Sequence, residues 1–285
     1  MGAVVKCPNG GCGADIVRSQ RHCIACGADI GAPNVRAAND SAEVSALGVR
    51  YADELRKAQD VGYEADFLRF VELLAQSKAV VCMPSSRLLT LASDPASLLS
   101  TFGLQIEGES RVPLDNRFDN IRASVEEAFF PNYSREIRFA ALSLTDSGHA
   151  AYGACSVTLK DSSISNRATV FEFPLFKFAE VKSVKLSEAI PAGHRADWLG
   201  RSKLAAVKFD RRVEGMGDDQ MAEILLPTPT DTVSDCVEVH IYGSLNRYSI
   251  AGVVMTPEKR RADILIQKAV VENLTEIGVS VRYVA

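Results

Sequence analysis

The sequence predicts an α+β protein with a small cysteine-rich module at its N-terminus. Two observations lead to this fold class. Four of the seven cysteines lie at or before position 26, and strand-like segments are interleaved irregularly with helical ones, without a regular βαβ repeat. We expect three parts: the cysteine-rich module over residues 1–34, a helical linker over residues 35–78, and a domain over residues 79–285 in which helices flank a mixed or antiparallel sheet.

The composition is that of a soluble globular protein. Of the 285 residues 47% are hydrophobic and 24% are charged, and the net charge of −4 gives no overall attraction to nucleic acid or to an anionic membrane. No apolar run reaches the ~18 residues that a membrane-spanning helix needs. The first residues also lack the apolar region of a secretory signal. We therefore expect a cytoplasmic protein without a membrane partner.

Four cysteines have the spacing of a tetrahedral metal site. Cys7 and Cys12 form one pair, Cys23 and Cys26 form the other, and both pairs are followed by the same Gly-Ala-Asp-Ile sequence. In a reducing compartment such a cluster indicates metal binding, and a bound ion supplies folding energy that about thirty residues lack. The module resembles the zinc-ribbon family (CPxCG…CxxCG), with two extra residues in the first pair. We expect structural Zn²⁺, with His22 as a bystander.

The partner of this module is less well defined. Its positive side chains are few (Lys6, Arg18, Arg21 and His22), and it contains no aromatic residue on which a single-stranded base stacks. This composition favours docking to a protein, or structural support, over binding of nucleic acid. A protein and a nucleic acid both stay open as partners.

Helices and strands follow each other along the rest of the chain. Helical segments are recognised by apolar residues three or four positions apart, and strands by alternation with β-branched and aromatic residues. We expect helices over residues 44–58, 67–74, 95–102, 116–129 and 257–277. We expect strands over residues 80–83, 137–144, 154–160, 168–173, 204–209, 223–226, 237–242 and 279–284.

The segment from Glu136 to Phe173 has an unusual distribution of polar residues. Its three predicted strands carry polar side chains where a plain core strand carries Val or Ile. These side chains are Arg138, Ser143, Ser156, Thr158 and Thr169. They face either solvent or a ligand.

Several motifs in the C-terminal part resemble known families. The chain has no G-x-G-x-x-G, Walker, G-x-S-x-G or H-E-x-x-H motif. Its segments FFPNYSREIRFAALSL, AAYGACSVTLK, RATVF, DCVEVHIYGSL and IAGVVMTPEKR are similar to a widespread bacterial and fungal family of uncharacterised domains. Their order of arginine, Ser/Thr and glutamate strands also resembles ADP-ribosyltransferase-type toxin domains. The resemblance covers residues 80–285, and it departs at Glu172-Phe173-Pro174 and at Cys236.

The resemblance implies an NAD-dependent ADP-ribosyltransferase-like toxin or effector domain that is guided by the zinc ribbon. In such an enzyme a carboxylate beside the ribose stabilises positive charge as the N-glycosidic bond breaks. The resemblance implies Glu238, Arg138 and Thr169 as catalytic residues. It implies Arg138, Ser143, Tyr152 and His240 as NAD-binding residues, with Arg138 on a phosphate and Tyr152 on the nicotinamide.

Other interpretations of the same residues stay open. Arg138 is equally well explained as a strand residue that faces solvent. Glu238 and His240 are equally well explained as the solvent-exposed face of an edge strand. Glu223 is an alternative candidate for the catalytic acid. The alternative function is a non-catalytic zinc-ribbon protein that binds nucleic acid or a protein. A third alternative, a metal-dependent nuclease, needs several clustered acidic residues and a lysine. Asp161 beside Lys160 is a single acidic residue and does not meet this requirement. The enzyme hypothesis gains if Arg138, Glu238 and either Ser143 or Thr169 line one cleft.

Overall fold

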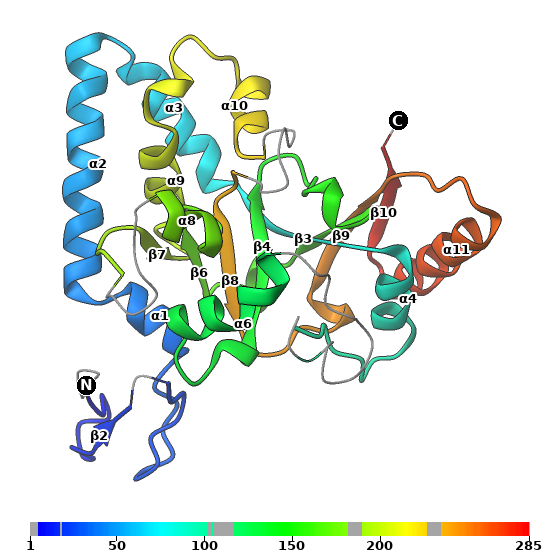
Figure 1. Cartoon of the computed structure of the whole chain (residues 1–285), viewed down its shortest axis with the longest axis horizontal. Coiled ribbons are helices and arrows are strands. Elements are labelled where there is room, and N and C mark those ends of the chain that lie inside the picture. Colours follow the sequence, from blue (N-terminus) through cyan, green and yellow to red (C-terminus); the bar gives the residue numbers. More distant parts are fainter. Residues whose placement is uncertain are drawn as a thin grey trace.

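An eight-stranded mixed sheet forms the centre of the molecule (Figure 1). The computed structural model describes residues 5–17, 19–101, 104, 117–181, 190–226 and 235–284. The strands of this sheet are β3 (Lys78–Met83), β4 (Ile137–Ser143), β5 (Cys155–Leu159), β6 (Ala168–Phe171), β7 (Arg195–Asp197), β8 (Glu238–Tyr242), β9 (Ile250–Met255) and β10 (Ser280–Tyr283). They lie in the order β10-β9-β5-β3-β4-β8-β6-β7, and only the β9–β10 pair is parallel. A separate hairpin of β1 (Val5–Lys6) and β2 (Asp15–Ile16) belongs to the N-terminal module.

Helices flank the sheet, and the predicted α+β class is confirmed. The described helices are α1 (Pro33–Ala38), α2 (Ser41–Val61), α3 (Glu64–Ala75), α4 (Ser85–Ser93), α6 (Arg117–Phe129), α7 (Asp161–Ile164), α8 (Leu175–Val181), α9 (Arg201–Phe209), α10 (Asp218–Ile224) and α11 (Arg261–Glu276). Six of the predicted strands are confirmed as β3, β4, β5, β6, β8 and β10, with ends that shift by no more than two residues.

Two predicted strands are wrong. Residues 204–209 belong to α9, and residues 223–226 form the end of α10 and the turn after it. Every side chain of α9 from Leu204 to Phe209 is buried. Five of these six residues are apolar, and a short buried run of this kind is the same pattern that a buried strand produces.

The helix predicted over residues 95–102 is also wrong in its position. The helix in this region is α4, which ends before Asp94, and residues 97–101 are irregular, with Phe102 outside the described residues. Asp94 accepts hydrogen bonds in a local turn, from the Ala96 N–H through its side chain (2.8 Å) and from the Ser97 N–H through its carbonyl (3.0 Å). An aspartate that closes such a turn resembles a helix N-cap in the sequence.

The predicted helical linker over residues 35–78 is helical, and it packs into the domain. Asp40 caps α2 by accepting a hydrogen bond from the Ala42 N–H, and α2 ends at Gly62, whose φ of 98° suits glycine. Phe67 and Phe70 of α3 are fully buried in the same hydrophobic cluster as the central strands. These helices are therefore part of the fold's main core.

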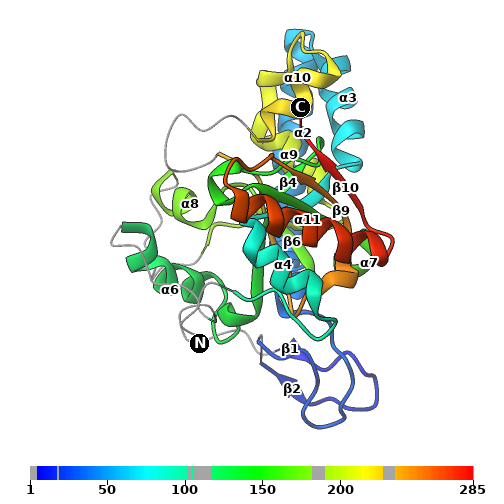
Figure 2. The same ribbon diagram turned by 90° about the vertical axis from the view of Figure 1, so that its right-hand side faces the viewer.

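The two faces of the sheet differ. On one face a large cluster joins Phe70 of α3 and Leu204 of α9 to β8, and joins Val270 of α11 and Leu88 of α4 to β9. On the opposite face a second cluster of α6 and α8 side chains covers β4, β6 and β8. Figure 2 shows α4 and α11 together beside β9 and β10, away from α2 and α3.

Candidate functional site

The four N-terminal cysteines meet at one point. Their sulfur atoms all lie within 4.8 Å of one another, with 3.8 Å between Cys7 and Cys26 and 3.6 Å between Cys12 and Cys23. A tetrahedron with Zn–S bonds of ~2.3 Å has edges of roughly 3.8 Å. Gly13 and Gly27, which follow the second cysteine of each pair, have φ of 61° and 71°, as their place in the two turns predicts. The cysteines are therefore positioned to bind a metal ion, and their spacing is compatible with zinc.

The protonation of these thiols is uneven. The Ala28 N–H donates to Cys26 and, together with neighbouring groups, lowers its pKa to about 7. At Cys7 the Asn9 N–H favours the thiolate, but burial and the other three sulfurs outweigh it and raise the pKa to about 12. Four thiolates at this distance repel one another, and a divalent cation relieves that repulsion.

Helix α1 joins the cysteine module to the sheet. Arg36 donates to the carbonyls of Gln20 and Gly31 within the module. Asn34 Nδ2 donates to the Arg167 carbonyl at 3.0 Å and to the His240 carbonyl at 3.0 Å. The first helix after the cysteines is thereby anchored to both structures.

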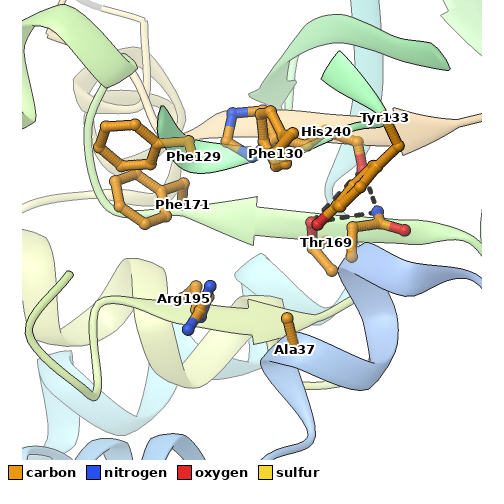
Figure 3. A pocket seen from close by; sticks show the side chains of 9 residues that line it. Ala37, Phe129, Phe130, Tyr133, Thr169, Phe171, Arg195 and His240 are labelled. Carbon is orange, nitrogen blue, oxygen red and sulfur yellow. Dashed lines mark hydrogen bonds between the residues drawn. The ribbon is translucent and has the colours of Figure 1, made fainter. Parts of the chain in front are cut away.

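A very small cavity lies beside this anchor (Figure 3). Its volume is about 10 Å³, room for roughly one water molecule. Tyr133, Thr169 and His240 lie around one end of it, and Arg195 lies below. The buried Asn34 Oδ1 has no hydrogen-bond partner among the described residues. The cavity is too small for a cofactor.

Glu238 and His240 form a polar pair on the face covered by α6 and α8. They are two residues apart on β8, so their side chains share a face, and His240 Nε2 lies 2.8 Å from Glu238 Oε2. The same oxygen accepts the Leu175 N–H at 3.1 Å. His240 is buried among aromatic rings, with Phe130 at 4.9 Å and Phe139 at 5.3 Å between centroids. The Glu238 side chain is 17% exposed, so the pair is reached from its carboxylate end.

A second carboxylate, Glu126 of α6, lies close to this pair. Arg122 Nε holds Glu126 Oε1 at 2.5 Å, and the Arg122 guanidinium lies 5.4 Å from the Phe139 ring centroid. Burial raises the pKa of Glu126, Arg122 counteracts this, and the negative charge of Glu238 adds to the increase. Burial raises the pKa of Tyr152 and the negative charge of Glu238 adds to the increase, although 60% of the residue is exposed.

The predicted site residues lie partly together and partly apart. Arg138 pairs with Ile241 across β4 and β8, so it projects from the opposite face to Glu238, where it donates to the carbonyls of Leu99 (3.1 Å) and Glu136 (2.9 Å). The expected single cleft therefore does not include Arg138. Thr169 lies opposite His240 and donates to its carbonyl at 3.5 Å.

Ser143 lies on the same face as Glu238, but its hydroxyl forms hydrogen bonds with backbone groups of the following turn. Its hydroxyl donates to the Ser147 carbonyl at 2.8 Å and accepts the Thr145 N–H at 3.2 Å. The rival acid Glu223 is exposed on α10. The geometry thus brings Glu238, His240 and Thr169 together on adjacent strands. The Tyr152 ring packs against His149 instead, with 5.5 Å between centroids.

Glu126 and Arg122 were not among the predicted site residues. The only signal was their spacing of four on a predicted helix, which is common on solvated helix faces. Outside the four cysteines, the described residues hold no group of three or more His, Cys, Asp or Glu side chains positioned for a metal ion, which is what the nuclease alternative needs.

Comparisons with known proteins add no family. No protein-family model matches the chain, and no curated protein matches it. The resemblance to ADP-ribosyltransferase-type domains thus depends on the quoted motifs alone. In the described part of the chain no helix has the length and apolar character of a membrane span.

Proposed function

We propose that the sheet domain is an enzyme that cleaves the N-glycosidic bond of NAD and transfers ADP-ribose, and that the N-terminal module is a structural zinc ribbon. Glu238 is the central residue of this proposal. The ribbon holds the ion through Cys7, Cys12, Cys23 and Cys26.

One observation carries the enzyme proposal. Buried carboxylates with a structural role use both oxygens here: Glu172 accepts from Arg50 and His194, and Glu43 accepts from Gly193 and Arg195. Glu238 differs, because both of its hydrogen bonds reach Oε2, and Oε1 has no partner among the described residues. One oxygen fixes the carboxylate, and the other stays available to a substrate hydroxyl.

The surrounding groups suit the reaction. The bond between ribose C1′ and the nicotinamide nitrogen breaks, the electron pair leaves with nicotinamide, and C1′ bonds to an acceptor oxygen. Glu238 stabilises the positive charge at the ribose. Glu126, whose pKa burial raises, takes the proton that the acceptor loses. Arg138 has no part in this proposal, because it projects from the opposite face of the sheet. On the face of Glu238, where the substrate would bind, the positively charged side chain is Arg122.

A matched pair of variants tests this function. Glu238→Gln keeps the size of the side chain and removes its charge, so we expect release of nicotinamide from NAD to fall about 100-fold or more. Glu223→Gln, an exposed acid on α10, serves as the control and keeps full activity. Nicotinamide is measured by chromatography after incubation with lysate as a source of acceptors. Equal rates in the two variants, or no turnover by the wild-type protein, would exclude the proposal.

One observation favours the second candidate, a ribbon that docks to a protein. Ile24 lies between the cysteines of the second pair and is 85% exposed, and Val17 is 59% exposed. An exposed apolar side chain at the tip of a metal turn, such as that of Ile24, fits a protein surface better than a phosphate backbone. Ile24→Ser should reduce partner capture without loss of zinc or of NAD cleavage.

A further inference from the structure

A groove crosses the half of the sheet that lies farthest from Glu238. Its volume is about 300 Å³, and its floor includes Thr158 of β5 and Gly252 of β9. Thr158 pairs with Gly252, and Gly252 pairs with Ser280, so these residues form one row across three strands. The lining residue on the nearest strand is Lys78 of β3, two strands from β8, so with a strand spacing of about 4.8 Å the groove begins roughly 10 Å from the strand of Glu238. It is a separate site.

Three basic side chains stand around this floor. Lys78 Nζ lies 3.9 Å from Asp161, and Arg282 Nη2 lies 3.6 Å from Asp146. Both distances exceed the ~2.7–2.9 Å of a hydrogen-bonded ion pair. Arg282 Nη2 also donates to the Thr145 carbonyl, at 3.4 Å. Lys160 has no ion pair among the described residues. With three cations and two acids, the lining carries a net charge of +1 in a protein whose overall charge is −4.

We infer that this groove binds a small molecule that carries phosphate groups. Its volume lies at the lower end of the ~300–1,000 Å³ range of small-molecule sites. A phosphate oxygen that approaches Arg282 can form a shorter ion pair than the present one with Asp146, and one that approaches Lys160 gives it a first ion-pair partner. The hydroxyl of Ser280 lies on the same rim as Arg282 and donates to a phosphate in the same way.

The floor admits a ligand close to the backbone. Gly252 has no side chain, so the centre of the groove is open to the peptide plane of β9. A metal cation fits the groove less well. Asp146 and Asp161 each face a basic side chain already, and they do not form a metal-binding group with a third ligand in the described residues.

Calorimetric titration of the full-length protein tests the inference, with pyrophosphate and ADP as probes and adenosine as the uncharged comparison. We expect both phosphate probes to bind and adenosine not to bind. The double variant Lys160→Gln/Arg282→Gln should weaken both affinities about tenfold or more, as expected when charge-assisted contacts are lost. Arg260→Gln is the matched control, because Arg260 is 85% exposed and lies outside the groove.

The outcomes separate this site from the proposed NAD chemistry. The inference holds if Glu238→Gln binds pyrophosphate as the wild-type protein does while the double variant does not. It is overturned if the wild-type protein gives no binding heat up to millimolar pyrophosphate. It is equally overturned if Arg260→Gln loses as much affinity as the double variant, since the effect would then reflect general surface charge. Thermal unfolding of each variant shows that the fold is intact.

Discussion

The N-terminal ribbon and the sheet domain are stabilised in opposite ways. Among the described residues of the N-terminal module, the buried cluster adds Ile16 and Ile30 to the cysteines, with Ala14 packed against them, which is too little apolar surface to order about thirty residues. The sheet domain has a cluster that includes side chains from Leu47 to Val279, so its stability comes from burial between distant parts of the chain. In one region four cysteines positioned for a metal ion lie where a core is lacking, whereas the other region depends on burial along its whole length.

The strongest test of this contrast is removal of the metal. A bound zinc ion contributes on the order of 10 kcal/mol or more to the folding of such a module. Cys23→Ser, or treatment with a chelator, should therefore unfold residues 5–30 and leave the sheet domain folded. NMR amide spectra distinguish the two regions. Cys82→Ser serves as the control, since Cys82 lies on β3, far along the chain from the cysteine cluster. Simultaneous loss of the sheet-domain signals would show that the contrast is wrong.

The converse experiment removes core volume from the sheet domain. Phe70 is fully buried and contacts Phe209 edge-on, with 6.1 Å between ring centroids. Phe70→Ala should lower the free energy of unfolding by about 3–5 kcal/mol, because it creates a cavity between α3 and α9. Urea unfolding measures the loss, and metal analysis of the folded variant should still give the wild-type metal content. A variant that loses the metal too would argue against two independent sources of stability.

A smaller change in the free energy of unfolding is expected when the pH is lowered. Burial alone would raise the pKa of Glu172, but hydrogen bonds from His194 and Arg50 outweigh it and lower the pKa to about 2. A carboxyl whose pKa falls on folding stabilises the protein above its ordinary pKa, and this contribution disappears as the pH falls toward 2. It amounts to on the order of 3 kcal/mol at neutral pH.

The measurement compares Glu172→Gln with the wild-type protein in urea at several pH values. The variant should be less stable near pH 7, and the difference should shrink as the pH falls from about 5 toward 2. Glu223→Gln, which alters an exposed acid, should show no such pattern. A difference that stays constant across this range would mean that the charge of Glu172 does not contribute.

The smallest effect concerns the connection between the two regions. Asn34→Ala removes the hydrogen bonds to the carbonyls of Arg167 and His240, which should cost about 1–3 kcal/mol. Amide hydrogen exchange in β6 and β8 should increase, while the metal stays bound. Asn39→Ala, at the exposed C-terminus of α1, is the control and should leave exchange unchanged. Unchanged exchange in Asn34→Ala would show that the two regions are not coupled through α1.

The features that the sequence predicted well are those encoded locally. The cysteine cluster depends on spacing within 20 residues, and the strands around Phe139 and Val157 follow from their own alternation. α9 was missed because complete burial removes the periodicity that separates a helix from a strand. Periodicity reports which residues face water, and in α9 none of the six from Leu204 to Phe209 does.

The candidate site shows why local patterns are insufficient. Alternation correctly places Glu238 and His240 on one face of β8, but the face of Arg138 depends on the register between β4 and β8. Ile137 pairs with Tyr242, so Arg138 pairs with Ile241 and points away from Glu238. A shift of one residue would have put all three on one face. The approach of α6, which brings Glu126 to the site, is equally a tertiary property.

The arrangement of the strands also sets an order of assembly during synthesis. The cysteine cluster and the apolar residues packed with it all lie at or before Ile30, so this module can form from the first part of the chain to be synthesised. α2 and α3 must wait for α9, and β3 at the centre of the sheet stays without neighbours until β4 and β5 are made. Such non-local pairing slows folding and leaves apolar faces exposed meanwhile. The nascent chain thus has the complete cysteine module ahead of an incomplete sheet, and we expect chaperone dependence to appear in the sheet domain.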